Sequence, residues 1–424
     1  MSTAFKRIPT TLLAFVVVFL TLALVLYPEQ GFRAGVDGLK VFWSVVLPAL
    51  LPFFILSEML MGLGVVHALG VILEPLMRPL FSVPGVGAFA LSMGLAAGYP
   101  MDAVITGKFR KNKLCTRIEG ERLLAFTNTA DPLFMFGAVA VGMFHSPQLG
   151  MLLAIAHYIA AFLVGVAFKF YGIGRNKRGG DDVEVQAPTR TRGNIFVRAY
   201  REMIRARQED GRPFGKLLGD SVNDSIKTAL MIGGFIMFFA VLLKVLALVG
   251  IIPLLAVPIE MLFRVFGFDV SLVQAFIAGL FEIDIGSAQA AVSSAPLIQQ
   301  LIIVSFIIAW SGLSVHAQVA SVLVGTDIRM GPYMFARLLH AVLAGIFTLV
   351  FWNAGWGQEA TTVMANFMPV LQAVADPSTS HWGLSLIVMR NWFLLFGGVV
   401  LLALVVHFFR GARVVAWSAR SNRR

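Results

Sequence analysis

The apolar run at 297–324 is long enough to cross a lipid bilayer, yet polar and small residues interrupt its middle. The interrupting residues are Ser311, Gly312, Ser314, His316 and Gln318. A membrane helix tolerates polar side chains at mid-depth only where they find partners, because the hydrocarbon core offers none. Broken helices of this kind form binding sites halfway across the membrane. The run therefore predicts a membrane protein with a polar site at mid-depth.

A second polar interruption occurs in the earlier apolar run 119–144. Its residues are Thr127, Asn128, Thr129, Asp131 and Pro132. Proline frees a carbonyl one turn back, and threonine or asparagine can bond the freed group. The segment is either a ligand site with unwound backbone or a proline kink stabilised by threonine. Interrupted runs at corresponding places in two halves indicate an internal repeat.

The composition assigns the chain to the polytopic membrane proteins. It is 58% hydrophobic and 13% charged, whereas soluble domains carry about 25% charged residues. The net charge of +11 comes from basic residues in short connections, which marks cytoplasmic loops rather than a nucleic-acid partner. Cys115 is the single cysteine, so neither an intrachain disulfide nor a cysteine metal cluster is expected.

The predicted fold class is all-α, with about eight spanning helices and two re-entrant hairpins in an inverted repeat. The predicted spans are 10–28, 41–62, 119–144, 149–171, 226–250, 297–324, 333–354 and 384–409. Segments 85–107 and 268–296 are rich in Gly, Ala and Ser, which predicts hairpins that face protein or a water-filled cavity. An amphipathic stretch precedes each hairpin, at 65–82 and 251–267.

The predicted organisation has five parts. They are an N-terminal span and connection at 1–39, a first repeat at 40–171, a basic loop at 172–216, a second repeat at 217–354, and an outer segment, last span and basic tail at 355–424. The distribution of Lys and Arg places both termini and the basic loop in the cytoplasm. The loop is interpreted mainly as a solvated linker with a short amphipathic helix, and alternatively as a lipid or partner contact.

The tip of the first predicted hairpin has three candidate ligand-binding residues and one acid. Gly98, Tyr99 and Pro100 would leave backbone groups free to bind a substrate, and Asp102 follows them. The alternative is a structural turn at the cytoplasmic face with a solvated carboxylate.

The second predicted hairpin places two carboxylates, Glu282 and Asp284, in an apolar segment, followed by Gly286 and Ser287. Buried carboxylates are costly unless paired, hydrated or protonated. Glu282 is the first candidate for a proton or cation site, Asp284 the second, and Asp131 and Asp102 complete the set. The alternative is a turn at the outer surface whose acids meet water.

The remaining ionisable residues leave their roles open. His316 would either titrate or donate a hydrogen bond between helices. Arg337 and His340 would either counter an acid or mark the membrane interface. Walker A, His-Glu-x-x-His and Gly-x-Ser-x-Gly sequences do not occur, so the chain is not expected to be an enzyme or to hold a metal or cofactor. Coupling to protons or cations is expected instead.

Five runs of sequence carry a family resemblance. They are AGYPM at 97–101, ERLLAFTNT at 121–129, FGAVAVGMF at 136–144, GLFE at 279–282 and GLSVHAQ at 312–318. Together they resemble the YlbJ/SpoVV family of sporulation integral membrane proteins, within the Gate, or nucleoside-recognition, superfamily. The chain departs from the family pattern at Asp102, Asp131 and Asp284, each of which adds a carboxylate.

The resemblance implies a dipicolinate transporter of the outer forespore membrane in spore-forming Firmicutes. It also implies the architecture of concentrative nucleoside transporters, with two hairpins and two broken helices around one site, and a homotrimer. The first hypothesis is therefore an elevator-type secondary transporter of a small organic anion, with dipicolinate as the first substrate. A carrier of nucleosides or other polar heterocycles is the second hypothesis, and a non-transporting membrane scaffold is the third.

Overall fold

The computed structural model describes residues 10–172, 194–356 and part of 394–406, and every regular element in these ranges is a helix. The helices of the first half are α1 (Thr10–Leu26), α2 (Pro28–Val41), η2 (Phe42–Val46), α3 (Leu47–Gly62), α4 (Val65–Phe81), α5 (Gly87–Ala97), α6 (Met101–Lys111), α7 (Arg117–Thr127), η3 (Leu133–Met143) and α8 (Pro147–Phe168). Those of the second half are α9 (Ile195–Asp210), α10 (Phe214–Leu248), α11 (Ile251–Phe266), η5 (Val270–Leu272), α12 (Val273–Phe281), α13 (Ile283–Ala291), α14 (Leu297–Trp310), α15 (Gly312–Val322) and α16 (Met330–Asn353).

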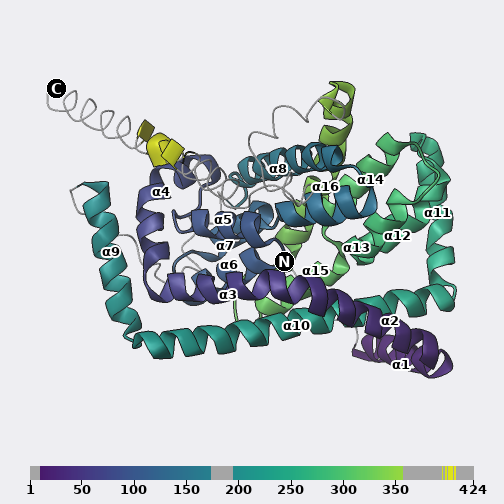
Figure 1. Ribbon diagram of the computed structural model, residues 1–424, viewed down its shortest axis with the longest axis horizontal. Coiled ribbons are helices and arrows are strands. Elements are labelled where there is room, and N and C mark those ends of the chain that lie inside the picture. The colour runs from purple at the N-terminus through teal and green to yellow at the C-terminus, as the bar shows by residue number, and fades with distance from the viewer. Residues whose placement is uncertain are drawn as a thin grey trace, which may run out of the picture.

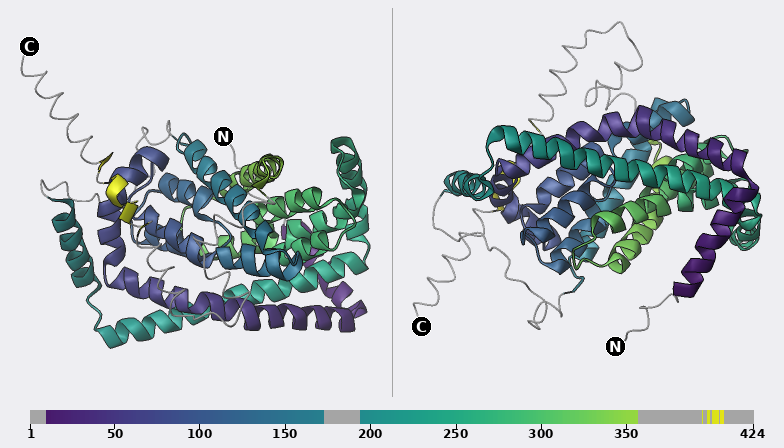
Figure 2. Two further views of the ribbon diagram at one scale, coloured as in Figure 1. Left: turned by 45° about the horizontal axis from the view of Figure 1, so that its top comes forward. Right: turned by 90° about the horizontal axis from the view of Figure 1, so that it is seen from below.

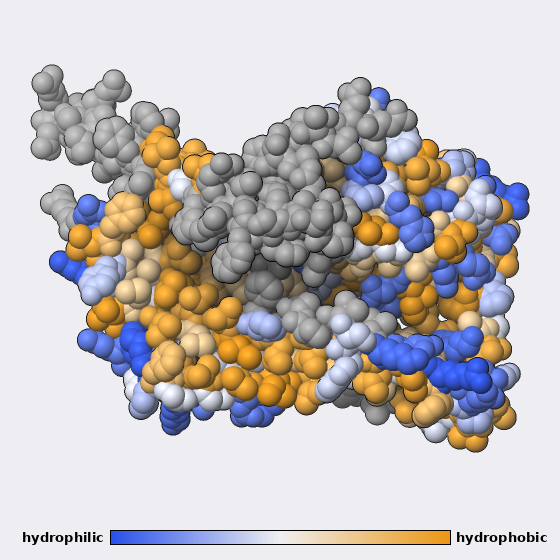
Figure 3. Space-filling model, in the orientation of Figure 1, coloured by the Kyte–Doolittle hydropathy of each residue, from blue (hydrophilic) through white to orange (hydrophobic). Residues whose placement is uncertain are grey.

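Four helical stretches in the described ranges are long and apolar enough to cross a membrane, or up to six if two bent pairs each count as one span. The four are α8, α10, the α14–α15 pair and α16. Long helix α10 packs against α2 and α3, and exposes apolar side chains such as Leu230 and Phe238. The face over α3 and α10 is largely apolar (Figure 3). The molecule is an all-α polytopic membrane protein.

The two halves repeat one order of elements. In each, a long helix turns through a left-handed glycine into an amphipathic helix: α3 through Gly64 into α4, and α10 through Gly250 into α11. Both glycines have φ near +80°, at 76° and 81°, where a side chain would be strained. A helix pair, a broken span and an unbroken helix follow in each half. Helices α4 and α11 lie across opposite ends of the long axis, in agreement with an inverted relation (Figures 1 and 2).

Several boundaries differ from the sequence prediction. The chain turns by 103° after α1 into the amphipathic helix α2, which apolar content alone does not reveal. Helix α10 begins at Phe214, inside the segment predicted as the basic loop, because Lys216, Asp220 and Asp224 lower the hydropathy of its first three turns. The predicted outer segment 355–382 lies almost entirely outside the described residues, as do most of the last span 384–409 and loop residues 173–193.

Candidate functional site

Four helix breaks lie in two pairs, and the two breaks of each pair contact each other. The chain leaves helical geometry at 98–100, 128–132, Glu282 and Ser311. A Cβ atom on Gly98 would lie 2.6 Å from Asp131 Oδ2, and one on Gly312 would lie 2.9 Å from the Phe281 carbonyl oxygen. Each hairpin break therefore touches the broken span of its own repeat.

Tyrosine side chains join the two pairs of breaks across the repeat boundary. The Tyr99 hydroxyl donates to the Ile308 carbonyl at 2.6 Å, and the Tyr333 hydroxyl donates to Asn128 Oδ1 at 3.0 Å. Trp310 Nε1 also donates to the Leu280 carbonyl at 3.0 Å, within the second repeat. Residues predicted from both repeats thus surround one region in the interior.

On the first-repeat side of this region, the polar side chains form hydrogen bonds with one another and with nearby backbone. Asp102 is fully buried and accepts from Asn128 Nδ2 at 2.8 Å and from the Thr127 hydroxyl at 3.1 Å. Asn128 therefore uses both ends of its carboxamide within the protein, and Thr129 bonds the Thr127 carbonyl at 3.4 Å. These predicted binding residues maintain the shape of the break, and the Thr127 and Asn128 carbonyls are also occupied, by Thr129 and Arg337.

Arg337 lies at the same place and is fully buried. Its guanidinium donates to the carbonyls of Ala125, at 2.6 Å, and Asn128. These are carbonyls at the C-terminal end of α7, where a cation is favoured. Among the described residues Arg337 forms no ion pair, although the buried Asp102 interacts with it electrostatically. The Arg337 Nε has no hydrogen-bond partner in this part of the chain. The sequence left its role open, although an arginine inside an apolar span is itself a functional signal.

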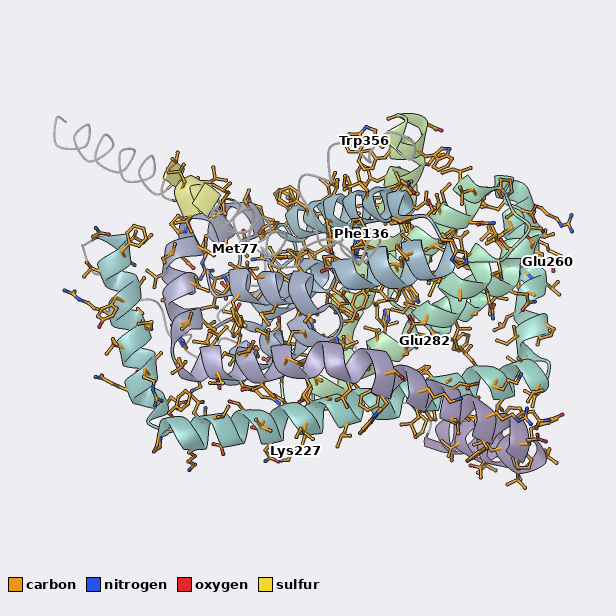
Figure 4. The ribbon with its side chains drawn as sticks, viewed as in Figure 1. Met77, Phe136, Lys227, Glu260, Glu282 and Trp356 are labelled. Atoms are coloured by element: carbon orange, nitrogen blue, oxygen red, sulfur yellow. The ribbon has the colours of Figure 1, made fainter. Side chains whose placement is uncertain are left out.

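The second-repeat side contains unpaired buried polar atoms. Within the described part of the chain, four buried polar atoms form no hydrogen bond of good geometry: Glu282 Oε2, Ser287 Oγ, Ser314 Oγ and His316 Nε2. The Ser314 hydroxyl nevertheless lies close to the Glu282 carboxyl group. All four residues were predicted as site residues, and Glu282 lies inside the helical body (Figure 4). An unpaired buried polar group costs about 1–3 kcal/mol, so a polar ligand that bonded these atoms would remove this cost.

Aromatic rings flank His316. The imidazole centroid lies 4.4 Å from that of Trp310 and 5.1 Å from that of Tyr333. Its Nδ1 lies 2.7 Å from the Gly312 carbonyl, so Nδ1 carries the ring proton when the imidazole is neutral and Nε2 is a free acceptor. Neither of these aromatic residues was predicted, because aromatic residues in an apolar run carry no distinguishing signal.

The other predicted residues take local structural roles. Gly286 packs against Gly279 between the two arms of the hairpin, where a Cβ would lie 2.3 Å from the Gly279 Cα. Asp131 Oδ1 accepts from the Phe134 N–H at 2.9 Å at the start of η3. The Asp284 N–H points at Glu282 Oε1 at 3.5 Å, and the Ser311 hydroxyl donates to the Trp310 carbonyl at 2.6 Å. Gln318 is buried.

Comparison with known proteins gives two matches. The family model described as Gate, nucleoside recognition, matches residues 43–173, a range that covers the first hairpin and the first broken span. The sporulation integral membrane protein YlbJ of Bacillus subtilis (strain 168) is 43% identical over 348 residues, which are 82% of this chain and 84% of that protein. No solved structure matches.

Proposed function

The chain belongs to the family of the sporulation integral membrane protein YlbJ, and from this membership we propose that it is a secondary transporter of a small organic anion, with dipicolinate as the first candidate. In this proposal it acts in the outer forespore membrane as a homotrimer with cytoplasmic termini, and moves its substrate out of the mother cell. The hairpins and broken spans would move together against α3 and α10, as in an elevator.

The observation that carries the proposal is the buried guanidinium of Arg337, which has hydrogen bonds to carbonyls but no ion pair among the described residues. Its charge is partly offset by the carbonyls at the end of α7 and by the buried Asp102, which interacts with it electrostatically without forming an ion pair. A buried cation without an ion-pair partner attracts an anion, because the local dielectric is low. Helices α6, η3, α13 and α15 all begin at the breaks. Helix N-termini favour anions there.

The unpaired atoms of the second repeat would contribute the polar contacts. Ser287 and Ser314 each offer a hydroxyl that can donate to a carboxylate, and His316 presents Nε2 between two rings. A flat heteroaromatic dicarboxylate suits a place that combines hydroxyls, aromatic faces and one arginine. Glu282 and Asp284 would then hold a coupling cation near the bound anion.

A nucleoside or similar polar heterocycle is the second candidate. The description of the matching family model, nucleoside recognition, favours it. Glu282 also favours it, because a carboxylate accepts from sugar hydroxyls and repels a dianion. The two candidates differ in what they require of Arg337, which the anion needs and the nucleoside does not.

Binding to the purified protein distinguishes the candidates. We expect calorimetry to show dipicolinate binding. Arg337→Gln should raise the Kd by about tenfold or more, because it removes one charged hydrogen-bonding group. Arg122→Gln is the matched control, since Arg122 is also buried and bonds carbonyls, of Ser82 and Tyr171, away from the breaks. Arg337→Lys keeps the charge and should bind within a few-fold of the native protein. Uridine binding without dipicolinate binding would reject the anion in favour of the second candidate.

A further inference from the structure

Two histidines outside the group of unpaired atoms face each other where the repeats meet. His157 in α8 and His340 in α16 have ring centroids 4.4 Å apart, tilted by 46°, and both are buried. They are separated by 183 residues, and each is the eleventh residue of its helix. The pair therefore occupies equivalent positions in the two repeats, close to the axis that would relate them.

Hydrogen bonds determine where each neutral ring carries its proton. The Ala130 N–H donates to His157 Nε2 at 3.2 Å, so this nitrogen is an acceptor and the His157 proton is on Nδ1. His340 Nε2 lies 2.9 Å from the His157 carbonyl oxygen, so it must be the donor, and His340 Nδ1 has a free lone pair. Both Nδ1 atoms are buried and have no partner among the described residues.

The pair is connected to the break of the first repeat. His157 bonds the Ala130 N–H, while the adjacent Tyr158 hydroxyl bonds the Ala130 carbonyl at 3.1 Å. Arg337 lies one helical turn before His340 and interacts electrostatically with both histidines. A ligand at this break would thus lie close to the arginine and to the histidine pair.

The charges around the histidine pair explain why a proton would bind there only together with an anion. Arg337 and Tyr158 face the pair from its own helices, Asp131 lies at the break, and neither α14 nor η3 contains an ionisable residue. Helix α7 carries its ionisable groups, Arg117, Glu119, Glu121 and Arg122, in its first half, away from the break. The buried Asp102 interacts electrostatically with Arg337 but is bonded to Thr127 and Asn128 and forms no ion pair with the arginine. A proton on His340 Nδ1 would therefore place a second positive charge beside Arg337 in a buried site, which is unfavourable until a negative ligand compensates it.

We propose that the His157–His340 pair is the binding site for a proton that moves together with the organic anion. The inference rests on the proposed function. The proton adds to the lone pair of His340 Nδ1 from the side where the anion enters, and leaves from the same nitrogen on the other side. Because binding free energies are reciprocal, the proton strengthens anion binding by the factor by which the anion strengthens proton binding.

The first test is the number of protons taken up on binding. Calorimetry of dipicolinate binding in two buffers with different ionisation enthalpies gives this number directly. We expect uptake of about one proton near neutral pH, where both histidines start neutral, and none in His340→Gln, whose amide N–H can replace the Nε2 donor but cannot titrate. His67→Gln is the matched control, because His67 in α4 also has a buried unpaired Nδ1. The same proton uptake in His340→Gln as in the native protein would overturn the inference.

The second test is transport in proteoliposomes. An inward proton gradient should raise native dipicolinate uptake by about five-fold or more, the lower end of typical coupling. His340→Gln should lose this increase and keep exchange of labelled for unlabelled dipicolinate at equal pH, which needs no net proton movement. A gradient response that survives in the variant would contradict the inference. A native protein that neither binds nor exchanges dipicolinate would instead contradict the proposed function.

Discussion

At the scale of residues, Arg110 and Asp327 form a two-pronged ion pair. Arg110 Nε and Nη2 each donate to one carboxylate oxygen of Asp327 at 2.7 Å. The pair joins the end of α6 to the loop between α15 and α16, and therefore links the first repeat to the second. Glu121 and Arg329 make a similar link nearby, with Arg329 Nε 2.7 Å from Glu121 Oε1.

The Arg110–Asp327 pair predicts a specific dependence of stability on pH. Hydrogen bonding by Arg110 holds the pKa of Asp327 below its ordinary value of 3.8. The folded protein thus binds this proton less readily than the unfolded chain, so the pair's contribution is complete above about pH 4 and is lost as pH falls further. We expect Asp327→Asn to lower the melting temperature of the detergent-purified protein at pH 7, and the difference from the native protein to shrink near pH 3. A difference of equal size at both pH values would show that the ion pair contributes nothing through its charge.

At this scale the sequence predicts the polar residues of the site but not the residues that contact them. Glu282, Ser314 and His316 were predicted because each is polar inside an apolar run, and each has an unpaired buried atom. The pairing of Arg337 with Asn128, and of His340 with His157, joins residues about 200 positions apart. No local pattern encodes such contacts.

At the scale of elements, the second hairpin depends on a close contact between its arms. Gly286 in α13 lies against the backbone of α12, and an added Cβ would be 2.3 Å from the Gly279 Cα and 2.9 Å from the Ala275 carbonyl oxygen. Backbone atoms cannot rotate away as a flexible side chain can, so the arms must separate to admit a methyl group.

A glycine-to-alanine pair tests this contact. We expect Gly286→Ala to destabilise the protein by about 1–3 kcal/mol, the usual effect of overpacking, seen as a lower melting temperature in detergent. Gly234→Ala in α10 is the control, because a Cβ there meets nothing within 4 Å, and alanine favours helix over glycine by about 1 kcal/mol. Equal melting temperatures for the native protein and Gly286→Ala would show that the arms are not tightly packed.

The breaks could be located from the sequence because proline, glycine and clusters of polar residues interrupt the apolar runs. The structure has breaks at 98–100, 128–132, Glu282 and Ser311, within the segments that the sequence singled out. The short amphipathic helix predicted within the basic loop corresponds to α9. Helix α2 was harder to find, because its polar face lowers the mean hydropathy and makes it resemble a connection rather than a helix.

At the scale of the whole molecule, the two repeats extend toward opposite ends and contribute residues to one interior region. The order of elements is the same in both, and α4 and α11 lie at opposite ends (Figure 1). At the breaks, the unpaired polar atoms of the predicted site residues belong to the second half, whereas Asp102, Thr127 and Asn128 of the first half bond one another. The sequence predicts the repeated order, because matching corners and breaks recur, but this asymmetry depends on side-chain geometry that only the folded structure contains.

In the proposed function, a small organic anion crosses the membrane through this region. Uptake of labelled dipicolinate and of labelled uridine into proteoliposomes tests it, with protein-free liposomes and Arg337→Gln as controls. We expect saturable dipicolinate uptake that exceeds uridine uptake and falls at least tenfold in Arg337→Gln, because the variant lacks the charged contact to the anion. Uptake of uridine alone would make the protein a nucleoside carrier, and uptake of neither would contradict transport and favour a membrane scaffold.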